Sequence, residues 1–436
     1  MNRSKRIFSG LGVLAALLLS PLCQAQVASA SGADAVAAGD HGANRWVATW
    51  SSAPIAPGPT TIDALFGGDR SRSFDNQTIR HIVHTSVGGR RVRVRVSNAF
   101  GFQPLRVGAA QVALSTSGPA IRAGSSRRLT FSGQPTILVP AGAVAVSDAV
   151  EFDVPVAGDL AVSLYLPGAT EPATFHEFTL QTSYITGAGN FTSATDLPGA
   201  TPTQSVFYLS VVEVQAQESI GVVVAFGDSI TQGGGSTVDA NRTWPDILST
   251  RLNSNPYRPR LSVINQGVGC GRLLFDLCGP SGAARFDRDV LAVTGVKTVI
   301  VHLGLNDIMI PSTLPLFGLP EFAAESVSAA EITVGLQQLI QRARARGVKI
   351  IGATITPFGS STIPGVFTPE SEAKRQAVNR WIRNSGAFDG VIDFEAAVRD
   401  PANPARLRPA FDADGVHLTD AGYEAMAHAI NLSMLF

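Results

Sequence analysis

The stretch Val222-Val-Val-Ala-Phe-Gly227-Asp228-Ser229-Ile230-Thr231 decides the fold class of this chain. A short apolar run that ends in turn residues is typical of a buried strand in a parallel sheet. Ser229 would then follow the carboxyl end of that strand, where open α/β sheets place their ligand sites. The same residues also fit a serine that only caps the next helix. The rest of the chain has to decide between these two roles.

From Gly221 onward the sequence alternates between strand and helix patterns, which predicts a parallel sheet covered by helices on both faces. The expected strands are 222–226, 261–265, 298–303, 349–354 and 391–393. Helix starts are predicted at Ser328, at Thr368 and at Thr419. Glu331 completes a capping box with Ser328, and Pro369 suits the first position after Thr368.

The preceding residues, 45–216, have a different pattern. Arg91-Val-Arg-Val-Arg-Val-Ser97 alternates polar and apolar side chains, as a half-buried strand does. Several other short strand-like runs follow, separated by Gly, Pro and Ser, and no helical period appears. We therefore expect an all-β sandwich of jelly-roll type at 45–216 and a catalytic α/β domain at 217–436, with the boundary near 215–219.

Composition supports two folded domains. The chain has 436 residues, of which 45% are hydrophobic and 16% charged, so it can bury a sizeable core. The 34 acidic and 34 basic residues give zero net charge, which argues against a nucleic acid or an anionic membrane as partner. The expected partner is a small-molecule or glycan ester substrate, without stable membrane insertion; the sequence predicts no oligomeric state.

The N-terminus resembles an export signal. Arg3, Lys5 and Arg6 precede the apolar run 7–19, and small residues surround Ala25. The apolar run is too short to span a bilayer. We expect a signal peptide at 1–25, a flexible leader at 26–44, and a secreted or periplasmic protein.

Export would leave two cysteines, Cys270 and Cys278, in an oxidising compartment. The short segment between them can close, so a disulfide is expected. A pair of buried free thiols is the alternative, because the same spacer could form a helical turn that separates them.

Three further stretches follow Ser229 at the ends of strands or before helices. Residues 263–271 end the second expected strand in a glycine-rich loop, residues 301–307 end the third, and residues 412–417 precede the last helix. Because the carboxyl ends of parallel strands share one edge, these stretches can converge there.

Together these stretches supply the groups that acyl transfer requires. Ser229 is the expected nucleophile, His417 the base, and Asp414 the acid that orients His417, with Asp412 as its rival. The oxyanion donors would be the Asn306 side chain and backbone N–H groups of Ser229 and of the glycine-rich loop.

With these motifs in place, the sequence resembles the SGNH (GDSL) hydrolase family over about residues 220–436. Gly227-Asp228-Ser229 looks like the first block of that family, 304–307 its third and 414–417 its fifth. The resemblance implies a flavodoxin-like three-layer fold, hydrolysis of carboxylic esters, and no metal or other cofactor. Aligned on Asn265, the family's second-block oxyanion glycine falls on Cys270, which also has a backbone N–H but lacks the conformational freedom of glycine.

Other interpretations of single residues are weaker. His81 and His84 would face opposite sides of a strand, which argues against a metal pair. His302 lies in a buried strand and is expected to be a packed histidine. Lys297, Lys349 and Lys374 lie in the wrong places for a Ser–Lys dyad. Thr231 stands where a G-x-S-x-G elbow has its second glycine, so a standard α/β-hydrolase is disfavoured.

The sequence therefore predicts an exported serine esterase that acts through an acyl-enzyme on short acyl esters or acetylated carbohydrate. Two alternatives remain open: an acyltransferase of the same fold, and a carbohydrate- or surface-binding protein whose hydrolase domain is inactive.

Overall fold

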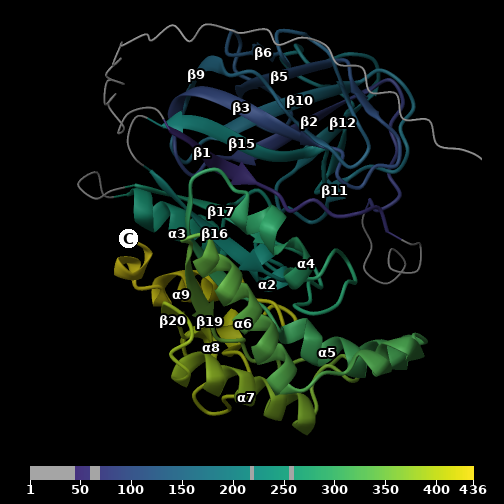
Figure 1. The fold of residues 1–436 in the computed structure, drawn as a ribbon. Coiled ribbons are helices and arrows are strands. Elements are labelled where there is room, and N and C mark those ends of the chain that lie inside the picture. The colour runs from purple at the N-terminus through teal and green to yellow at the C-terminus, as the bar shows by residue number, and fades with distance from the viewer. Residues whose placement is uncertain (1–44, 59–68, 217–219, 255–259) are drawn as a thin grey trace, which may run out of the picture. The chain divides into compact units, whose positions relative to one another are not determined.

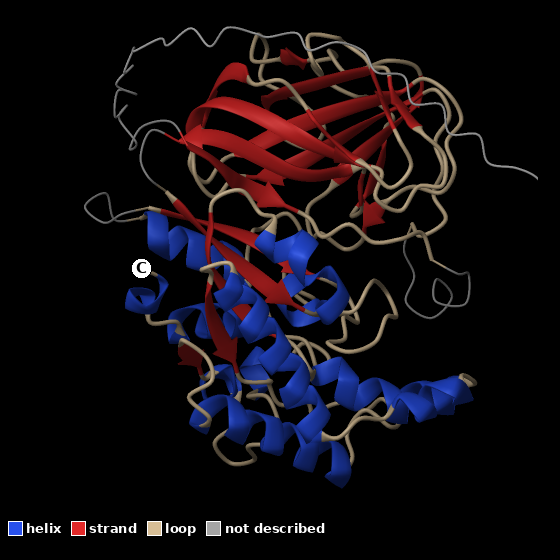
Figure 2. Ribbon diagram, viewed as in Figure 1, coloured by secondary structure: helices blue, strands red, loops and turns tan. Residues whose placement is uncertain are grey.

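The computed structural model describes residues 45–58, 69–216, 220–254 and 260–436 (Figure 1). All of them belong to one compact unit. The expected signal peptide and leader lie outside the described residues. Strands dominate as far as residue 216, and helices alternate with strands after residue 220 (Figure 2).

The first region contains two antiparallel sheets. One has the order β1 (Arg45–Ser51), β15 (Leu209–Ala216), β3 (Gly89–Ser97) and β8 (Val144–Val146), and β9 (Val150–Val154) also pairs with β3. The other has the order β13 (Thr201–Thr203), β12 (Ser183–Ala188), β2 (Gln77–His84), β10 (Asp159–Leu166), β5 (Ala109–Leu114) and β6 (Arg127–Leu129). Two short antiparallel pairs are β4 (Leu105–Val107) with β7 (Ile137–Val139), and β11 (Phe175–His176) with β14 (Val206–Phe207). This confirms the expected β-sandwich.

Strand β3 shows why the alternating sequence folds this way. Val92, Val94 and Val96 are buried on one face. On the other face, Arg93 and Arg95 both form ion pairs with the buried Glu213 of β15. The alternation thus places the valines of β3 in the core and its arginines on the opposite face, where they pair with Glu213 of the neighbouring strand.

The second region is built on a five-stranded parallel sheet with the order β17 (Leu261–Gly267), β16 (Gly221–Gly227), β18 (Val296–His302), β19 (Lys349–Ala353) and β20 (Gly390–Ile392). This is the flavodoxin-like order that the family resemblance implies. Every expected strand is present, with ends that differ by at most two residues. Strand β16 is buried along its whole length, as its apolar sequence predicts.

Helices and helical turns connect these strands or follow the last of them. They are α2 (Ser229–Gln232), α3 (Trp244–Asn253), α4 (Gly282–Phe286), η1 (Asp287–Leu291), α5 (Leu305–Thr313), η2 (Leu314–Phe317), η3 (Pro320–Glu325), α6 (Ala329–Ala345), α7 (Pro369–Asn384), α8 (Phe394–Val398), η4 (Pro409–Phe411), α9 (Asp420–Ala429) and η5 (Leu432–Leu435). The predicted caps are confirmed, because Ser328, Thr368 and Thr419 each accept a bond from the first turn of α6, α7 and α9.

The sandwich covers the edge strand of the parallel sheet. Strand β17 is at one end of the sheet order, and β1 lies against it. Ser262 Oγ donates to the carbonyl of Ala48 at 2.6 Å, and the N–H of Val263 donates to Ser86 Oγ at 2.8 Å. Polar backbone groups on the open side of β17 are therefore partly satisfied by the sandwich.

Candidate active site

Ser229 lies where β16 turns into α2. It is the first residue of that helix, and the side chain of Asp228 caps the helix by accepting from the N–H of Ile230 at 3.0 Å. Gly227 permits the sharp turn, since a Cβ there would lie 2.0 Å from Thr231 Oγ1 and 2.8 Å from the carbonyl oxygen of His302. The cap is thus Asp228, and the Ser229 hydroxyl is available for chemistry.

The His417 ring bridges Ser229 and Asp414. His417 Nε2 lies 2.8 Å from Ser229 Oγ, and His417 Nδ1 lies 2.7 Å from Asp414 Oδ2. The three predicted residues, which span 188 positions of sequence, therefore form one hydrogen-bonded chain. This is the arrangement in which a histidine can take a hydroxyl proton while a carboxylate holds its ring.

The Asp414 carboxylate is held in its charged form. Partial burial raises its pKa, but the hydrogen bond and charge of His417 and the N–H groups of His417 and Val416 outweigh this effect and hold the pKa well below the usual range. These two N–H groups donate to Asp414 Oδ1 at 2.7 and 3.0 Å. Asp414 is thus a fixed negative charge next to the ring.

The rival acid, Asp412, has a different role. Its Oδ1 accepts from the N–H of Gly415 at 2.5 Å, which shapes the loop before His417. Asp414, rather than Asp412, contacts the His417 ring.

The candidate oxyanion donors lie around the same serine. Asn306 is 4% exposed in the first turn of α5, and its Nδ2 donates to the carbonyl of Gly271 at 3.0 Å. This bond uses one amide proton and leaves the second available. Ser229 opens α2, so its N–H has no acceptor within the helix. Ser229, Asn306 and Cys270 all line one cavity.

The backbone of Cys270 has a left-handed conformation. Its φ is +44°, in the left-handed region that favours glycine. Cys270 also forms a disulfide with Cys278, with the two Cα atoms 5.8 Å apart. The predicted disulfide is confirmed. It anchors a residue whose backbone conformation is unfavourable without a constraint.

Two positioning residues were not anticipated from the sequence. Asp307 accepts from the N–H groups of Leu273 and Leu274 at 2.7 and 2.9 Å, which fixes the loop after Cys270. Arg285 is buried and donates to the carbonyls of Gln266 and Gly227 at 2.8 and 2.7 Å, which ties the ends of β17 and β16 together. The Gly-Leu-Asn-Asp motif contained a signal for Asp307, whereas nothing near Arg285 distinguished it from a surface arginine.

The cavity beside the triad has a volume of about 520 Å³, within the range of small-molecule sites. Its walls are mainly apolar. Besides the catalytic candidates and nearby glycines, it is lined by Glu177, Phe178, Gln232, Met309, Ile310, Thr313, Leu314, Phe317, Ile363, Val366 and Val416.

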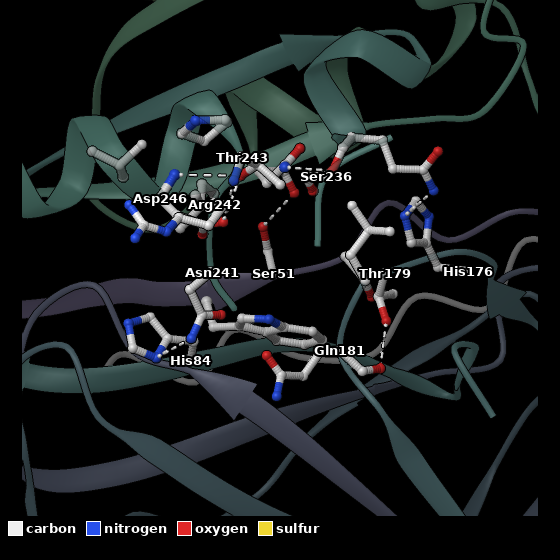
Figure 3. Close-up of a pocket in the computed structure, with 18 of the residues that line it drawn as sticks. Ser51, His84, His176, Thr179, Gln181, Ser236, Asn241, Arg242, Thr243 and Asp246 are labelled. Atoms are coloured by element: carbon white, nitrogen blue, oxygen red, sulfur yellow. Dashed lines mark hydrogen bonds between the residues drawn. The ribbon is translucent and has the colours of Figure 1, made fainter. Parts of the chain in front are cut away.

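A second, polar pocket lies between the sandwich and the residues after α2 (Figure 3). Asn241 Nδ2 contacts His84 Nδ1 at 3.2 Å there, and Thr243 donates to Asp246 at 2.6 Å. Its volume of about 80 Å³ is too small for an ester substrate. We regard it as part of the seam between the two regions.

The remaining candidates lie away from the triad. His81 is buried and bonded to Ser183 and Phe207, whereas His84 contacts Asp159 at 2.7 Å. Lys349 binds the C-terminal backbone, and Lys374 pairs with Glu370. No group of three or more His, Cys, Asp or Glu side chains suited to a metal occurs within the described part of the chain. None of the helices in that part is long and apolar enough to cross a bilayer.

Residues 225–425 match the model of the GDSL-like Lipase/Acylhydrolase family. A search of curated proteins found no match. Among solved structures, the chain is similar to an aryl esterase from M. smegmatis, with 17% identity, coverage of 50% of this chain and 100% of that one, and a TM-score of 0.39. A carbohydrate acetylesterase from Sinorhizobium meliloti gives 17% identity, coverage of 50% and 100%, and a TM-score of 0.38. A GDSL-like lipase from Bacteroides thetaiotaomicron gives 20% identity, coverage of 49% of this chain and 87% of that one, and a TM-score of 0.36.

Proposed function

Because residues 225–425 form a GDSL-like lipase/acylhydrolase domain, we propose that this serine hydrolase cleaves carboxylic esters through Ser229, His417 and Asp414. The observation that supports the proposal most directly is the hydrogen-bonded chain of Ser229 Oγ, His417 and Asp414, with contacts of 2.8 and 2.7 Å. Each contact has the length that proton transfer or ring orientation requires.

The first half of the reaction forms an acyl-enzyme. Ser229 Oγ attacks the ester carbonyl carbon while His417 Nε2 takes the hydroxyl proton, and Asp414 stabilises the resulting imidazolium. The carbonyl oxygen becomes an oxyanion, which the N–H groups of Ser229, Cys270 and Asn306 would stabilise. When the tetrahedral intermediate collapses, the carbon–oxygen bond to the alcohol breaks and His417 returns its proton to the leaving alkoxide.

Water completes the second half. It attacks the acyl-enzyme carbonyl as His417 takes its proton, the bond to Ser229 breaks, and the carboxylic acid leaves with Ser229 reprotonated. The side chains of His417 and Asp414 are 27% and 54% exposed. Solvent access to the base supports hydrolysis over transfer of the acyl group to another alcohol.

The proposed substrates are short acyl esters or acetylated carbohydrate, and the proposed location is outside the cytoplasm. The Cys270–Cys278 disulfide supports export, since such bonds persist in oxidising compartments. The predicted signal peptide at 1–25 remains a proposal.

A rapid-mixing experiment tests the mechanism. The protein, mixed with p-nitrophenyl acetate, should release p-nitrophenol, and mass spectrometry of the quenched protein should find an acetyl group on Ser229. A folded protein that hydrolyses the ester without acylating Ser229 would contradict the proposed nucleophile.

A further inference from the structure

We infer that the apolar cavity beside the triad binds the acyl chain of an ester of medium length, and that Phe178 of the sandwich forms part of its wall. This inference rests on the proposed ester hydrolysis and changes its preferred substrates from short acyl esters to esters whose acyl chain is of medium length. It gives the sandwich a direct role in substrate selection.

One wall of the cavity continues the helix face that carries Asn306. The lining residues of α5 and η2 are Met309, Ile310, Thr313, Leu314 and Phe317. They follow Asn306 at spacings of three, four, seven, eight and eleven residues, which places them on the same helix face. At about 1.5 Å per residue in α5 and about 2 Å per residue in the 3₁₀ helix η2, this face runs for roughly 18 Å from Asn306. Figure 1 shows the segment of α5 extending away from the parallel sheet.

Other apolar side chains also line the cavity. Ile363 and Val366 come from the segment between β19 and α7, and Val416 comes from the loop before His417. An extended glycan in this cavity would place hydroxyl groups against side chains that offer few hydrogen bonds, which is costly. An alkyl chain fits these walls, because it loses only contact with water.

We assign the cavity to the acyl group from the position of its apolar helix face, although His417 and Asp414 also line it. The carbonyl oxygen of the substrate must lie against Asn306, whereas the alcohol must leave beside His417 Nε2. The apolar helix face begins at Asn306. A chain attached to the carbonyl carbon on this side would therefore enter the cavity as the alcohol departs from the other side.

Phe178 reaches this cavity from the sandwich. It follows β11, is 39% exposed, and has a left-handed backbone with φ +51°. The preceding residue, Glu177, fixes the position of Phe178. Arg70 forms a buried ion pair with Glu177, and the Gln232 side chain, at the end of α2, donates to the carbonyl of Glu177.

The same arginine connects this segment to the oxyanion loop. Arg70 Nη1 donates to the carbonyl of Cys278 at 3.0 Å, and Cys278 is bonded to Cys270. The sandwich thus makes two contacts near the catalytic groups. One is with α2, the helix that begins at Ser229, and the other is with the disulfide of Cys270, a proposed oxyanion donor. Phe178 is therefore held at a defined position relative to the catalytic groups.

Two ester series test the assignment. In the first, p-nitrophenyl acetate, butyrate, hexanoate and octanoate are compared below their aggregation limits. Each buried methylene contributes up to about fourfold in kcat/KM, so we expect a rise of roughly tenfold or more from acetate to octanoate. In the second series, acetate esters of methanol, butanol and octanol should differ much less.

Variants test the role of Phe178. Phe178→Ala should lower kcat/KM for the octanoate by roughly three- to tenfold and leave the acetate within twofold. Phe191→Ala is the matched control, since Phe191 belongs to the same sandwich, is 41% exposed, and is absent from the cavity lining. Met309→Trp, which fills the cavity near Asn306, should lower the octanoate rate selectively. Circular dichroism and thermal melts check that each variant folds.

Several outcomes would overturn the inference without affecting ester hydrolysis. They are a kcat/KM that falls with acyl length, a dependence on the alcohol chain alone, and a Phe178→Ala variant that loses acetate and octanoate activity equally. By contrast, a wild-type protein that hydrolyses no ester faster than its Ser229→Ala variant would refute the proposed function itself.

Discussion

Two fully buried histidines illustrate how differently the sandwich and the parallel-sheet region use polar groups. In the sandwich, His81 Nδ1 and Nε2 lie 3.1 Å from Ser183 Oγ and 3.0 Å from the carbonyl of Phe207. In the parallel-sheet region, His302 Nδ1 lies 3.9 Å from Asp228 Oδ1, beyond hydrogen-bonding distance, and the other polar neighbour of the ring is the backbone of Thr354. Burial lowers the pKa of both histidines to about 4, so both are neutral near pH 7.

The same contrast extends to charged groups. Arg80 in the sandwich is fully buried and donates to Ser163 and to the carbonyls of Pro119 and Ala194. Asp228, beside Ser229, has an Oδ2 with no hydrogen-bond partner among the described residues. His81 and Arg80 of the sandwich thus have close hydrogen-bond partners, whereas Asp228, next to Ser229, has a carboxylate oxygen without one among the described residues. Such sites are where function is expected.

The largest expected effect tests whether catalysis resides only in the parallel-sheet region. Ser229→Ala should lower kcat for a p-nitrophenyl ester by roughly 10³-fold or more, because the nucleophile is lost while the oxyanion donors remain. Its thermal melt should match that of the wild type. A purified, folded variant that kept a tenth of the wild-type rate would place the chemistry elsewhere.

Asn306→Ala should have the next largest effect. We expect kcat to fall by roughly 10²- to 10³-fold with little change in KM, since the donor acts mainly on the developing oxyanion. Steady-state kinetics on one ester measures both constants. A rise in KM at unchanged kcat would instead identify Asn306 as a ground-state binding group.

Removing the disulfide should lower kcat by more than the loss of unfolding free energy alone would explain. The double variant Cys270→Ser with Cys278→Ser should lower kcat by roughly tenfold, because the left-handed backbone at residue 270 loses its anchor. Loop-closure entropy for so short a loop gives about 2–3 kcal/mol of unfolding free energy. Urea titration and ester kinetics on the same sample measure both quantities, and an unchanged kcat would contradict the role in donor placement.

Asp228 gives a pH-dependent prediction. Burial raises its pKa to about 7, against the opposing effects of the Ile230 N–H and of His417. In the unfolded chain the same carboxyl has a pKa of about 3.9. Between these values only the unfolded state loses the proton, so this group's contribution to stability is complete below about pH 4 and falls as the pH rises toward 7.

Asp228→Asn does not titrate and can still accept from the N–H of Ile230. Its unfolding free energy should therefore rise relative to that of the wild type by on the order of 1–3 kcal/mol between about pH 4.5 and pH 7. Denaturant titrations at both pH values measure the difference. A constant difference would show that the folded carboxyl ionises normally.

The smallest expected effect compares the two histidines directly. His81→Phe leaves Ser183 Oγ and the Phe207 carbonyl without their partner, so it should cost about 1–3 kcal/mol of stability. His302→Phe loses only weaker contacts, to Asp228 Oδ1 at 3.9 Å and to the backbone of Thr354, and packs against Phe394 as His302 does, so it should cost less than about 1 kcal/mol. Equal losses in thermal and denaturant unfolding would remove the distinction between the regions.

Much of the parallel-sheet region could be predicted because its signals are local. The apolar run before Ser229, the capping boxes at Ser328 and Thr368, and the order of the motifs depend on neighbouring residues. Convergence of Ser229, Asn306 and His417 followed from the rule that parallel strands end at one edge. Ser229 and Asp414 each lie within hydrogen-bonding distance of His417, and the catalytic roles of the three residues stay a prediction.

Other features depend on contacts distant in sequence. The bonds from Arg285 to Gln266 and Gly227, and from Arg70 to Glu177 and Cys278, bring together segments that no periodicity connects. The backbone conformation of Cys270 could not be predicted from the sequence, since its φ depends on the whole loop. The register of the sandwich strands and the contribution of Phe178 to the cavity likewise required the tertiary structure.

The covering of β17 by the sandwich affects any attempt to shorten this protein. A truncated enzyme that starts at Gly221 would keep the triad but expose the N–H of Val263 and the Ser262 hydroxyl, which now contact Ser86 and Ala48. An unprotected edge strand readily pairs with the edge of another molecule. We therefore expect the sandwich to protect β17 from such pairing, and its removal should favour aggregates even where Ser229, His417 and Asp414 are intact.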